Sequence, residues 1–477
     1  MSLEEMSSNM KILLVTGESL PYAKSGGLGD FIYSYGKALA KEGEDCSVIM
    51  PFYGVMRRKF PQLLENVFDQ YDFKMSWRDI NVTVFHEERD GVKFYFVCHD
   101  VFQRDNLYGY GDDNYRFALF MMAVHTFITR HNDYEIVHCN DWQTAVLPLL
   151  LNYNSKSIKT VLTIHNPAYQ GWGGRNDLSD FFNLSLGYYD SGFVRMGDCF
   201  NYLKTGIMSA DKINTVSRTH ARELLNDHSG FGGMGAIIDW CRHYDFSGIV
   251  NGLDIDVWNP KTDKQLAMNY TYENYVEGKK ANKRALLEKL GLDPDFQGPL
   301  FSAITRLSAQ KGVERIMDIF PHLEEKNARL IVIGTGEMEE QFLYKSLPFK
   351  NVYFVKRYDE ELAHLLYAAS DFFLMPSYFE PCGTSQLISM RYGTLPIVSD
   401  VGGLNDTVRD VSLGEGANGF TFYNTDYFGC VNAYYRACDL YWAKKMQPLI
   451  DVGMHGDYSW AKSAKEYLAL YRSIDWK

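Results

Sequence analysis

Short apolar runs alternate with longer amphipathic stretches along the chain, and the alternation occurs in two series. Buried parallel strands joined by crossover helices produce such a pattern. The apolar runs occupy residues 11–18, 47–51, 135–141, 160–166 and 212–216, and then 300–306, 329–334, 352–356, 371–377, 395–400 and 419–424. We therefore expect an α/β protein of two doubly wound domains whose strands end in ligand-binding turns.

Two segments depart from this pattern. Residues 73–98 alternate apolar and polar positions around Arg89-Asp90-Gly91, which predicts an antiparallel hairpin inserted in the first domain. An Asn-Gly turn at 251–252, followed by Asn259-Pro260, separates the two series. We place the domain boundary near Phe246, giving domains of residues 1–246 and 247–456. The amphipathic stretches at 312–325 and 460–474 are expected to be helices.

Composition removes several classes of function. The 477 residues carry 48 Lys and Arg against 60 Asp and Glu, and the net charge of -12 without a basic block argues against nucleic-acid binding. Eight cysteines without a C-x-x-C or zinc spacing indicate thiols in a reducing compartment, so we expect a cytoplasmic protein. The longest apolar segment, 117–128, is too short to cross a membrane, and the N-terminus lacks the features of a signal peptide.

A glycine-rich turn, KSGGLGDF at residues 24–31, follows the first predicted strand and opens a helix. Glycines at 26, 27 and 29 allow close backbone approach to a ligand, and a helix start attracts an anion. The segment is neither G-x-G-x-x-G nor a Walker loop, and an ordinary strand-to-helix turn also explains it.

Charged residues follow strands of the second half. Arg306 and Lys311 stand just beyond a strand end, where two fixed cations suit a diphosphate, although a solvated pair is the alternative. Glu380 precedes Pro381-Cys382-Gly383, and a helix is expected from Thr384. Glu380 is a candidate to bind sugar hydroxyls or stabilise an oxocarbenium-like centre; its alternative role is helix capping.

Polar side chains also follow strands of the first half. Asp141 and His165 end two predicted strands and carry the aromatic neighbours Trp142 and Tyr169, which favours a site over two structural residues. With 33 Tyr, 30 Phe and 8 Trp, 15% of the chain is aromatic, which fits a large core or surfaces that stack on hydroxylated ligands. The D-x-D at 254–256 lies in the turn region, so we do not expect it to bind metal.

Together these motifs resemble the bacterial glycogen synthases and plant starch synthases. KSGGLGD, HCNDW, HNPAYQG, NGLDIDVWNP, TRLSAQKG, FEPCGTSQL and YGTLPIVSDVGGLNDTV occur in that family's order, over about residues 11–475. The resemblance implies a GT-B fold, two Rossmann-like domains facing each other across a deep cleft. It also implies that the C-terminal segment, residues 457–477, is a helix that crosses back to the N-terminal, acceptor-side domain.

By resemblance, the reaction is a metal-independent, retaining transfer of glucose from ADP-glucose to the non-reducing 4-hydroxyl of glycogen or another α-1,4-glucan. The residues carried over fall into two sets. Asp141, His165, Arg306, Lys311 and Glu380 are the expected catalytic residues. The expected substrate-binding residues are Lys24, Gly26, Gly27, Asn251, Cys382, Gly383 and Thr384.

Other functions stay open at this stage. The same transfer with UDP-glucose is the nearest alternative, and a catalytically silent nucleotide-sugar or glucan-binding protein is a second. A pyridine-nucleotide oxidoreductase, also built of paired Rossmann-like domains, is a third. The sequence does not define the oligomeric state, and we expect neither nucleic-acid nor membrane partners.

Overall fold

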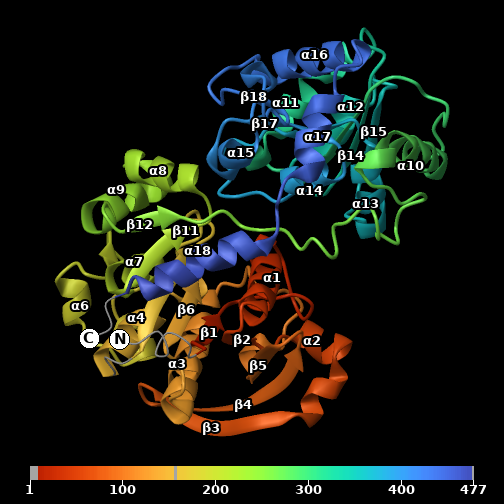
Figure 1. Ribbon diagram of the computed structural model, residues 1–477. Helices are drawn as coiled ribbons and strands as arrows, with labels where there is room; N and C mark the ends of the chain where they lie inside the picture. Colours follow the sequence, from red (N-terminus) through yellow and green to blue (C-terminus); the bar gives the residue numbers. More distant parts are fainter. Residues whose placement is uncertain (1–8, 155–157, 475–477) are drawn as a thin grey trace, which may run out of the picture. The chain divides into compact units, whose positions relative to one another are not determined.

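The structure is a computed structural model that describes residues 9–154 and 158–474 (Figure 1). The described chain divides into two compact units. Unit 1 extends to Gly252 and resumes at Trp460, whereas unit 2 is Leu253–Ser459. The boundary lies after the expected position near Phe246 because Phe246 belongs to a strand of the first sheet, paired with Ile213.

Unit 1 is built on one nine-stranded sheet. Its strands in spatial order are β12 (Phe246–Gly248), β11 (Lys212–Thr215), β7 (Lys159–Ile164), β6 (Ile136–Asn140), β1 (Lys11–Val15), β2 (Asp45–Pro51), β5 (Val92–Cys98), β4 (Arg78–Arg89) and β3 (Val67–Met75). The first seven are parallel, and β4 pairs antiparallel with both of its neighbours, β5 and β3. The predicted strands are confirmed, and their apolar runs are explained by helices that cover the sheet.

The predicted hairpin is wrong in one respect. Its turn is where expected, with Asp90 and Gly91 both at positive φ, as a tight two-residue hairpin requires. However, β5 also pairs in parallel with β2, with Ser47 opposite Lys93. Residues 67–98 therefore extend the main sheet rather than forming a separate insertion, because β5 is one of the sheet's own strands.

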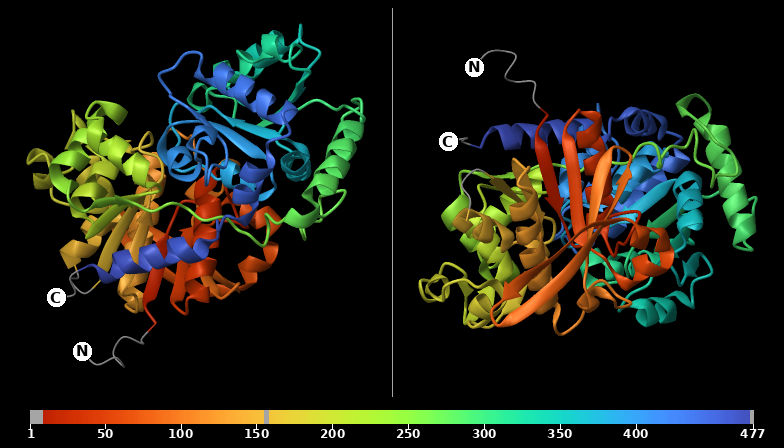
Figure 2. Two further views of the ribbon diagram at one scale, coloured as in Figure 1. Left: turned by 45° about the horizontal axis from the view of Figure 1, so that its top comes forward. Right: turned by 90° about the horizontal axis from the view of Figure 1, so that it is seen from below.

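The helices of unit 1 surround this sheet. They are α1 (Gly27–Lys41), α2 (Gly54–Lys59), α3 (Asp113–His131), α4 (Leu147–Asn154), α5 (Asp177–Phe182), α6 (Gly187–Asp190), α7 (Tyr202–Ser209), α8 (Arg218–Asn226), α9 (Gly230–Arg242) and α18 (Trp460–Arg472). A small sheet of β8 (Trp172–Gly173), β10 (Cys199–Asn201) and β9 (Arg195–Met196) is antiparallel. The chain's last helix, α18, lies alongside α1 (Figures 1 and 2), so it belongs to the N-terminal unit.

Unit 2 contains a six-stranded parallel sheet. Its spatial order is β15 (Val352–Val355), β14 (Arg329–Ile333), β13 (Leu300–Ile304), β16 (Phe372–Met375), β17 (Leu395–Ser399) and β18 (Phe420–Phe422). Its helices are α10 (Tyr275–Lys289), α11 (Val313–Met317), α12 (Glu339–Ser346), α13 (Glu360–Ala369), α14 (Ser385–Arg391), α15 (Gly402–Thr407), α16 (Gly429–Trp442) and α17 (Gln447–His455). All six strands coincide with predicted apolar runs.

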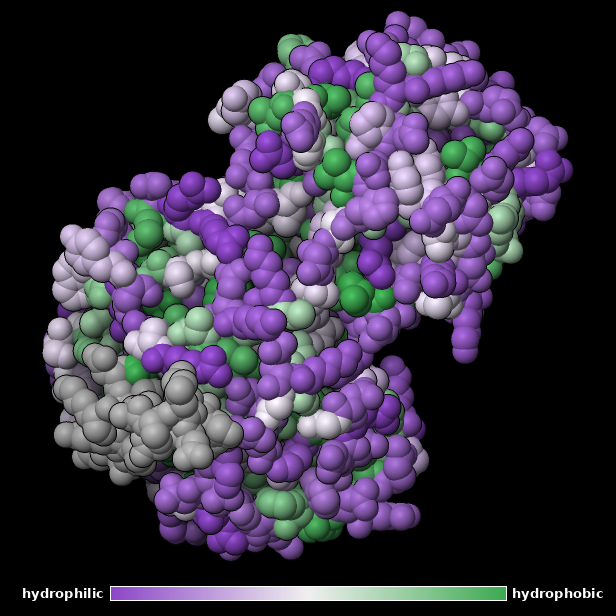
Figure 3. All heavy atoms as spheres, in the orientation of Figure 1, coloured by the Kyte–Doolittle hydropathy of each residue, from purple (hydrophilic) through white to green (hydrophobic). Residues whose placement is uncertain are grey.

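The helix predicted over residues 312–325 is shorter in the structure. It is α-helical only over α11 and then forms a 3₁₀ turn at Phe320–His322. Pro321 has no N–H to donate within an α-helix and clashes with the preceding turn, which explains the break. Most apolar side chains lie in the cores, and the face shown in Figure 3 is largely hydrophilic with scattered apolar residues.

Candidate functional site

The glycine-rich turn of unit 1 connects β1 to α1 and is organised by a residue that sequence reasoning missed. Glu18, 1% exposed, directs its carboxylate into the turn. Oε2 accepts from the Ser25 N–H and hydroxyl at 2.8 and 2.7 Å, and Oε1 accepts from the N–H groups of Gly26 and Gly29 at 3.1 and 3.0 Å. The sequence signal for this role was an acidic residue at the end of the first predicted strand and shortly before the glycine-rich turn.

This arrangement changes the expected roles of the turn residues. The N–H of Gly26, expected to face a ligand, donates to Glu18 instead. Lys24 forms an ion pair with Asp30, at 2.9 and 3.0 Å to its two carboxylate oxygens. Gly27 is exposed at the first position of α1, and a Cβ there would meet no atom within 4 Å. The helix start at Gly27 and the ammonium of Lys24 are therefore the parts of the turn accessible to a ligand.

Asp141 and His165 lie together at the ends of β6 and β7, as predicted. Asp141 adopts φ +59°, a conformation rare for residues with a side chain and concentrated at functional sites. Its Oδ1 accepts the N–H groups of His165 and Asn166 at 2.7 and 3.3 Å. Burial raises the pKa of Asp141 to about 7, and the nearby charge of Glu18 acts in the same direction.

His165 is neutral in this setting because burial lowers its pKa to about 3. Its Nε2 lies 2.9 Å from Oδ1 of Asn140, so the neutral ring donates there. The ring also packs edge-on against Phe31 of α1, with centroids 4.4 Å apart. The glycine turn, Asp141 and His165 thus form one site within unit 1.

A hollow of about 350 Å³ lies beside these residues in unit 1. Its lining includes four aromatic side chains, Tyr110, Trp142, Tyr169 and Trp172. Gly171, at φ +68°, is required here, because a Cβ would collide with the Trp142 ring. Trp142 and Tyr169 were expected beside a site, whereas Tyr110 and Trp172 were missed, although Trp172 directly follows the HNPAYQG motif.

One of the two predicted cations of unit 2, Lys311, contacts the predicted carboxylate, Glu380. Nζ of Lys311 lies 2.6 Å from Oε2 of Glu380, which also accepts the Ser377 hydroxyl at 3.0 Å. Arg306 is exposed and lines, with Lys311 and Ser377, a cavity of about 200 Å³ at the ends of β13 and β16. Glu380 is 7% exposed, so a buried carboxylate faces an ammonium beside an open pocket.

The loop after Glu380 packs tightly against the start of α15. The Glu380 carbonyl accepts the N–H of Gly403 at 3.0 Å, and a Cβ at Gly402 would collide with that same carbonyl. Cys382 is 5% exposed, and Gly383 takes φ +72°, close to the side chains of Glu380 and Gln386. Thr384 is the N-cap of α14, as expected, but its side chain makes no capping hydrogen bond.

Two residues near the unit boundary have different environments. The side-chain oxygen of Asn251 is buried and accepts no hydrogen bond from the described residues. In the D-x-D, Asp254 Oδ1 accepts the N–H groups of Asp256 and Val257, which is a turn interaction. In the described part of the chain, no three His, Cys, Asp or Glu side chains gather as a metal site would require.

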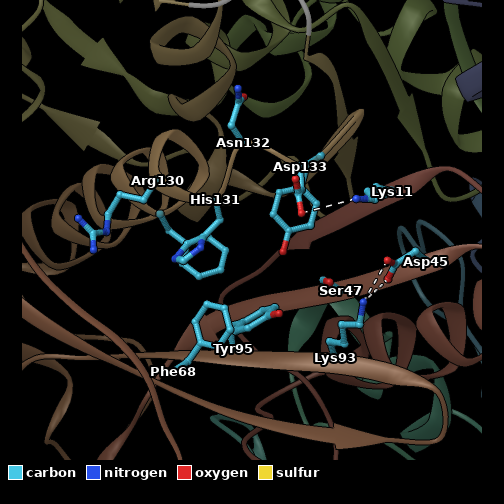
Figure 4. Close-up of a pocket in the computed structure, with 12 residues that line it drawn as sticks. Lys11, Asp45, Ser47, Phe68, Lys93, Tyr95, Arg130, His131, Asn132 and Asp133 are labelled. Atoms are coloured by element: carbon cyan, nitrogen blue, oxygen red, sulfur yellow. Dashed lines mark hydrogen bonds and ion pairs between the residues drawn. The ribbon is translucent and has the colours of Figure 1, made fainter.

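A second hollow of about 350 Å³ lies at the opposite, amino ends of the unit 1 strands (Figure 4). Four of its charged side chains are paired with one another, Lys11 with Asp133 and Lys93 with Asp45, and Arg130 pairs with Asp69 outside the lining. Ligands of open parallel sheets bind at the carboxyl ends of the strands, so this hollow is separate from the candidate site.

Comparison with known proteins agrees with the resemblance. The family described as "Starch synthase catalytic domain" matches residues 11–239, and "Glycosyl transferases group 1" matches residues 292–428. The chain is 40% identical to a glycogen synthase of Clostridium acetobutylicum, covering 98% of this chain and all of the relative. It is 38% identical to one of Lactococcus lactis, with the same coverage of both.

Solved structures agree with these relatives. The catalytic domain of starch synthase IV from Arabidopsis thaliana, bound to ADP and acarbose, matches with a TM-score of 0.86 and 32% identity, over 98% of this chain and 100% of that one. A sucrose-phosphate synthase from Thermosynechococcus elongatus matches in fold, with a TM-score of 0.60 and 17% identity over 98% of this chain and 99% of its own. Among the described residues, no helix has the length and apolarity to cross a bilayer. The two Rossmann-like units are those of a GT-B glycosyltransferase, and the chain belongs to the glycogen and starch synthase family.

Proposed function

We propose that this chain transfers glucose from ADP-glucose to the non-reducing 4-hydroxyl of an α-1,4-glucan, with retention at the anomeric carbon. The observation that carries the proposal is that Lys311, which lines a small pocket together with Arg306, is held against the carboxylate of Glu380. Fixed cations stabilise the negative charge of a leaving diphosphate, and a carboxylate stabilises a positively charged glucosyl centre. The structural relative that holds ADP and acarbose supports both the donor and the acceptor class.

In this proposal the cations act on the diphosphate. Arg306, exposed at the mouth of the pocket, offers a bidentate fork, and Lys311 offers a point charge. Lys311 is already held 2.6 Å from Glu380, so it is positioned before the donor arrives. Preorganised charges of this kind stabilise the departing group without reorganisation during the reaction.

Unit 1 supplies the acceptor side of the proposal. The hollow lined by Trp142, Tyr169 and Trp172 suits a neutral glucan, whose sugar faces stack on aromatic rings. Asp141 and neutral His165, at the ends of adjacent strands, are the polar groups for the reacting hydroxyl. Lys24 and the start of α1 at Gly27 contribute contacts to the donor.

We further propose that the reaction needs no metal ion and takes place in the cytoplasm. Positioned cations take the role that a metal would have, and the Asp254 carboxylate is engaged in a turn. The eight cysteines are all described, and none is bonded to another, as in proteins of reducing compartments. Dialysis against EDTA is expected to leave turnover unchanged; loss of activity that Mg²⁺ or Mn²⁺ restores contradicts metal independence.

Donor competition tests the proposed function. Purified protein is incubated with glycogen and labelled ADP-glucose or UDP-glucose under identical conditions, and label in the polymer is counted. Release of that label by an α-1,4-specific glucosidase checks the stereochemistry. Preferred transfer from ADP-glucose is the expected result. Preferred transfer from UDP-glucose assigns the alternative donor, and binding without transfer by either donor overturns the enzyme assignment.

A further inference from the structure

We propose that Glu18 is the positioning residue of the glycine turn, fixing Ser25 to Gly29 so that Lys24 and the start of α1 face the nucleotide sugar. The identity of the ligand that faces the turn rests on the proposed function. The ordering of the turn by Glu18 is independent of that function, since it follows from hydrogen bonds within unit 1.

The buried carboxylate of Glu18 is surrounded by hydrogen-bond donors of the turn. Both carboxylate oxygens accept two hydrogen bonds each, between 2.7 and 3.1 Å, from three N–H groups and the Ser25 hydroxyl. The side chain is 1% exposed, so water does not compete for these donors. Hydrogen bonds to an ionised acceptor are roughly twice as strong as neutral ones.

The turn needs such an anchor because its sequence is flexible. Three of the five residues from Ser25 to Gly29 are glycine, which loses more conformational freedom on ordering than any other residue. At the exposed positions little else constrains the backbone, since a Cβ at Gly27 would meet nothing within 4 Å. One buried carboxylate therefore sets the conformation of the whole turn.

The anchor also determines which donors remain for a ligand. A phosphate bound at the N–H groups of Ser25, Gly26 and Gly29 would have to displace a buried carboxylate of the same charge. The N–H groups of Gly27 and Leu28, at the first two positions of α1, form no hydrogen bond to the described residues. The ligand-facing part of the turn is thus this helix start with Lys24.

Glu18 has a second, electrostatic effect within unit 1. The titratable groups around Asp141 are Glu18, Tyr108 and His165. The negative charge of Glu18 opposes ionisation of Asp141. Removing that charge lowers the pKa of Asp141, so the acid limb of any pH-rate profile governed by Asp141 moves to lower pH. A residue that only stabilised the fold would not produce this shift.

The test compares Glu18→Gln with Ser25→Ala and a control. Glutamine keeps the size but turns an NH₂ group toward backbone N–H donors, whereas Ser25→Ala removes one hydrogen bond and keeps the carboxylate. The control, Asp211→Asn, alters a carboxylate that accepts from the Thr160 N–H and hydroxyl at 2.7 and 2.9 Å, before β11. Thermal unfolding checks that each variant is folded.

Hydrogen–deuterium exchange of the full chain gives the readout that is independent of activity. In Glu18→Gln the N–H groups of Ser25, Gly26 and Gly29, which donate to Glu18, are expected to exchange about tenfold faster, with β1 unchanged, and Ser25→Ala should accelerate exchange less. Unchanged exchange in Glu18→Gln, or equal acceleration there in Asp211→Asn, overturns the proposal. If Glu18→Gln does not fold, unchanged exchange in Ser25→Ala overturns it instead.

Kinetics test the consequence for the reaction. Misplacing the turn is expected to reduce kcat of Glu18→Gln about 100-fold while the KM for a maltooligosaccharide stays near that of the wild type. Wild-type kcat in a variant with a disordered turn refutes the link to the donor. A wild type that transfers no glucose refutes the proposed function, and the exchange result still decides the role of Glu18.

Discussion

Asp141 combines a strained backbone, at φ +59°, with a partly buried carboxylate that accepts two N–H groups. Strain of this kind persists only where the surroundings hold it in place, and it is concentrated at functional sites. The sequence located Asp141 by its place after a strand. The direction of its pKa shift comes from burial and from Glu18, whose proximity only the fold reveals.

The raised pKa of Asp141 predicts that the stability of the fold depends on pH. In the unfolded chain the group ionises near pH 4, but in the fold near pH 7, so the native state binds more protons between these values. Stability contributed by the protonated form is present below pH 4 and lost as the pH rises toward 7. Asp141→Asn keeps an acceptor oxygen and removes this dependence.

Urea unfolding at several pH values checks this prediction. Relative to that of the wild type, the free energy of unfolding of Asp141→Asn should rise by about 1 kcal/mol or more between pH 4 and pH 7. The value is kept small because the side chain is only partly buried. A stability difference between the two proteins that does not change with pH contradicts the raised pKa.

The two cations of unit 2, Arg306 and Lys311, are predicted to be needed for turnover. The double variant Arg306→Ala/Lys311→Ala should keep its fold and lose turnover by at least about 10²-fold, because the diphosphate loses both cations. The matched control, Lys326→Ala, removes a cation of the same unit that pairs with Asp439. Turnover measured with labelled donor decides: wild-type turnover in the folded double variant refutes the roles of both residues.

At the scale of the element, α18 packs against segments that lie far from it in the sequence, and polar contacts hold it there. Tyr471 is fully buried and lies 2.6 Å from Nδ1 of His138 on β6 and 2.7 Å from the hydroxyl of Tyr35 on α1. Ser463 donates to the Val250 carbonyl at 2.5 Å. Sequence periodicity predicted this helix, but polar partners inside the core decide where it docks.

Tyr471→Phe tests the polar contacts of α18. Two buried groups, on His138 and Tyr35, lose their partner, so we expect unfolding to become easier by about 1–3 kcal/mol. Tyr441→Phe is the control, since that hydroxyl donates to the Gln297 carbonyl near the surface of unit 2. The free energies of unfolding of the two variants are compared in urea, and equal values contradict a specific role for the Tyr471 hydroxyl.

At the scale of the whole molecule, the two units differ in how they are assembled from the chain. Unit 2 is one continuous segment, Leu253–Ser459, with its own parallel sheet. Unit 1 needs both ends of the described chain, because Trp460, Ala464, Tyr467 and Tyr471 are part of its apolar core.

Fragments test this difference. A fragment of residues 253–459 should fold alone with a cooperative thermal transition. A fragment of residues 9–252 should be less stable, and gain stability when a peptide of residues 460–474 is added, because the peptide covers the exposed core. Circular dichroism at increasing peptide concentration measures the effect. A first fragment as stable without the peptide as with it contradicts the contribution of α18.

The sequence alone determined the family, the two α/β units and the strands, because buried parallel strands need continuous apolar runs and the motifs follow them directly. It located Asp141, His165, Arg306, Lys311 and Glu380 by their place after strand ends. It did not show that Lys311 pairs with Glu380 or that β5 joins the main sheet, since both depend on contacts between distant segments. Only the tertiary structure showed that Glu18 anchors the glycine turn, because a carboxylate's partners are defined by burial and by the N–H groups folded around it.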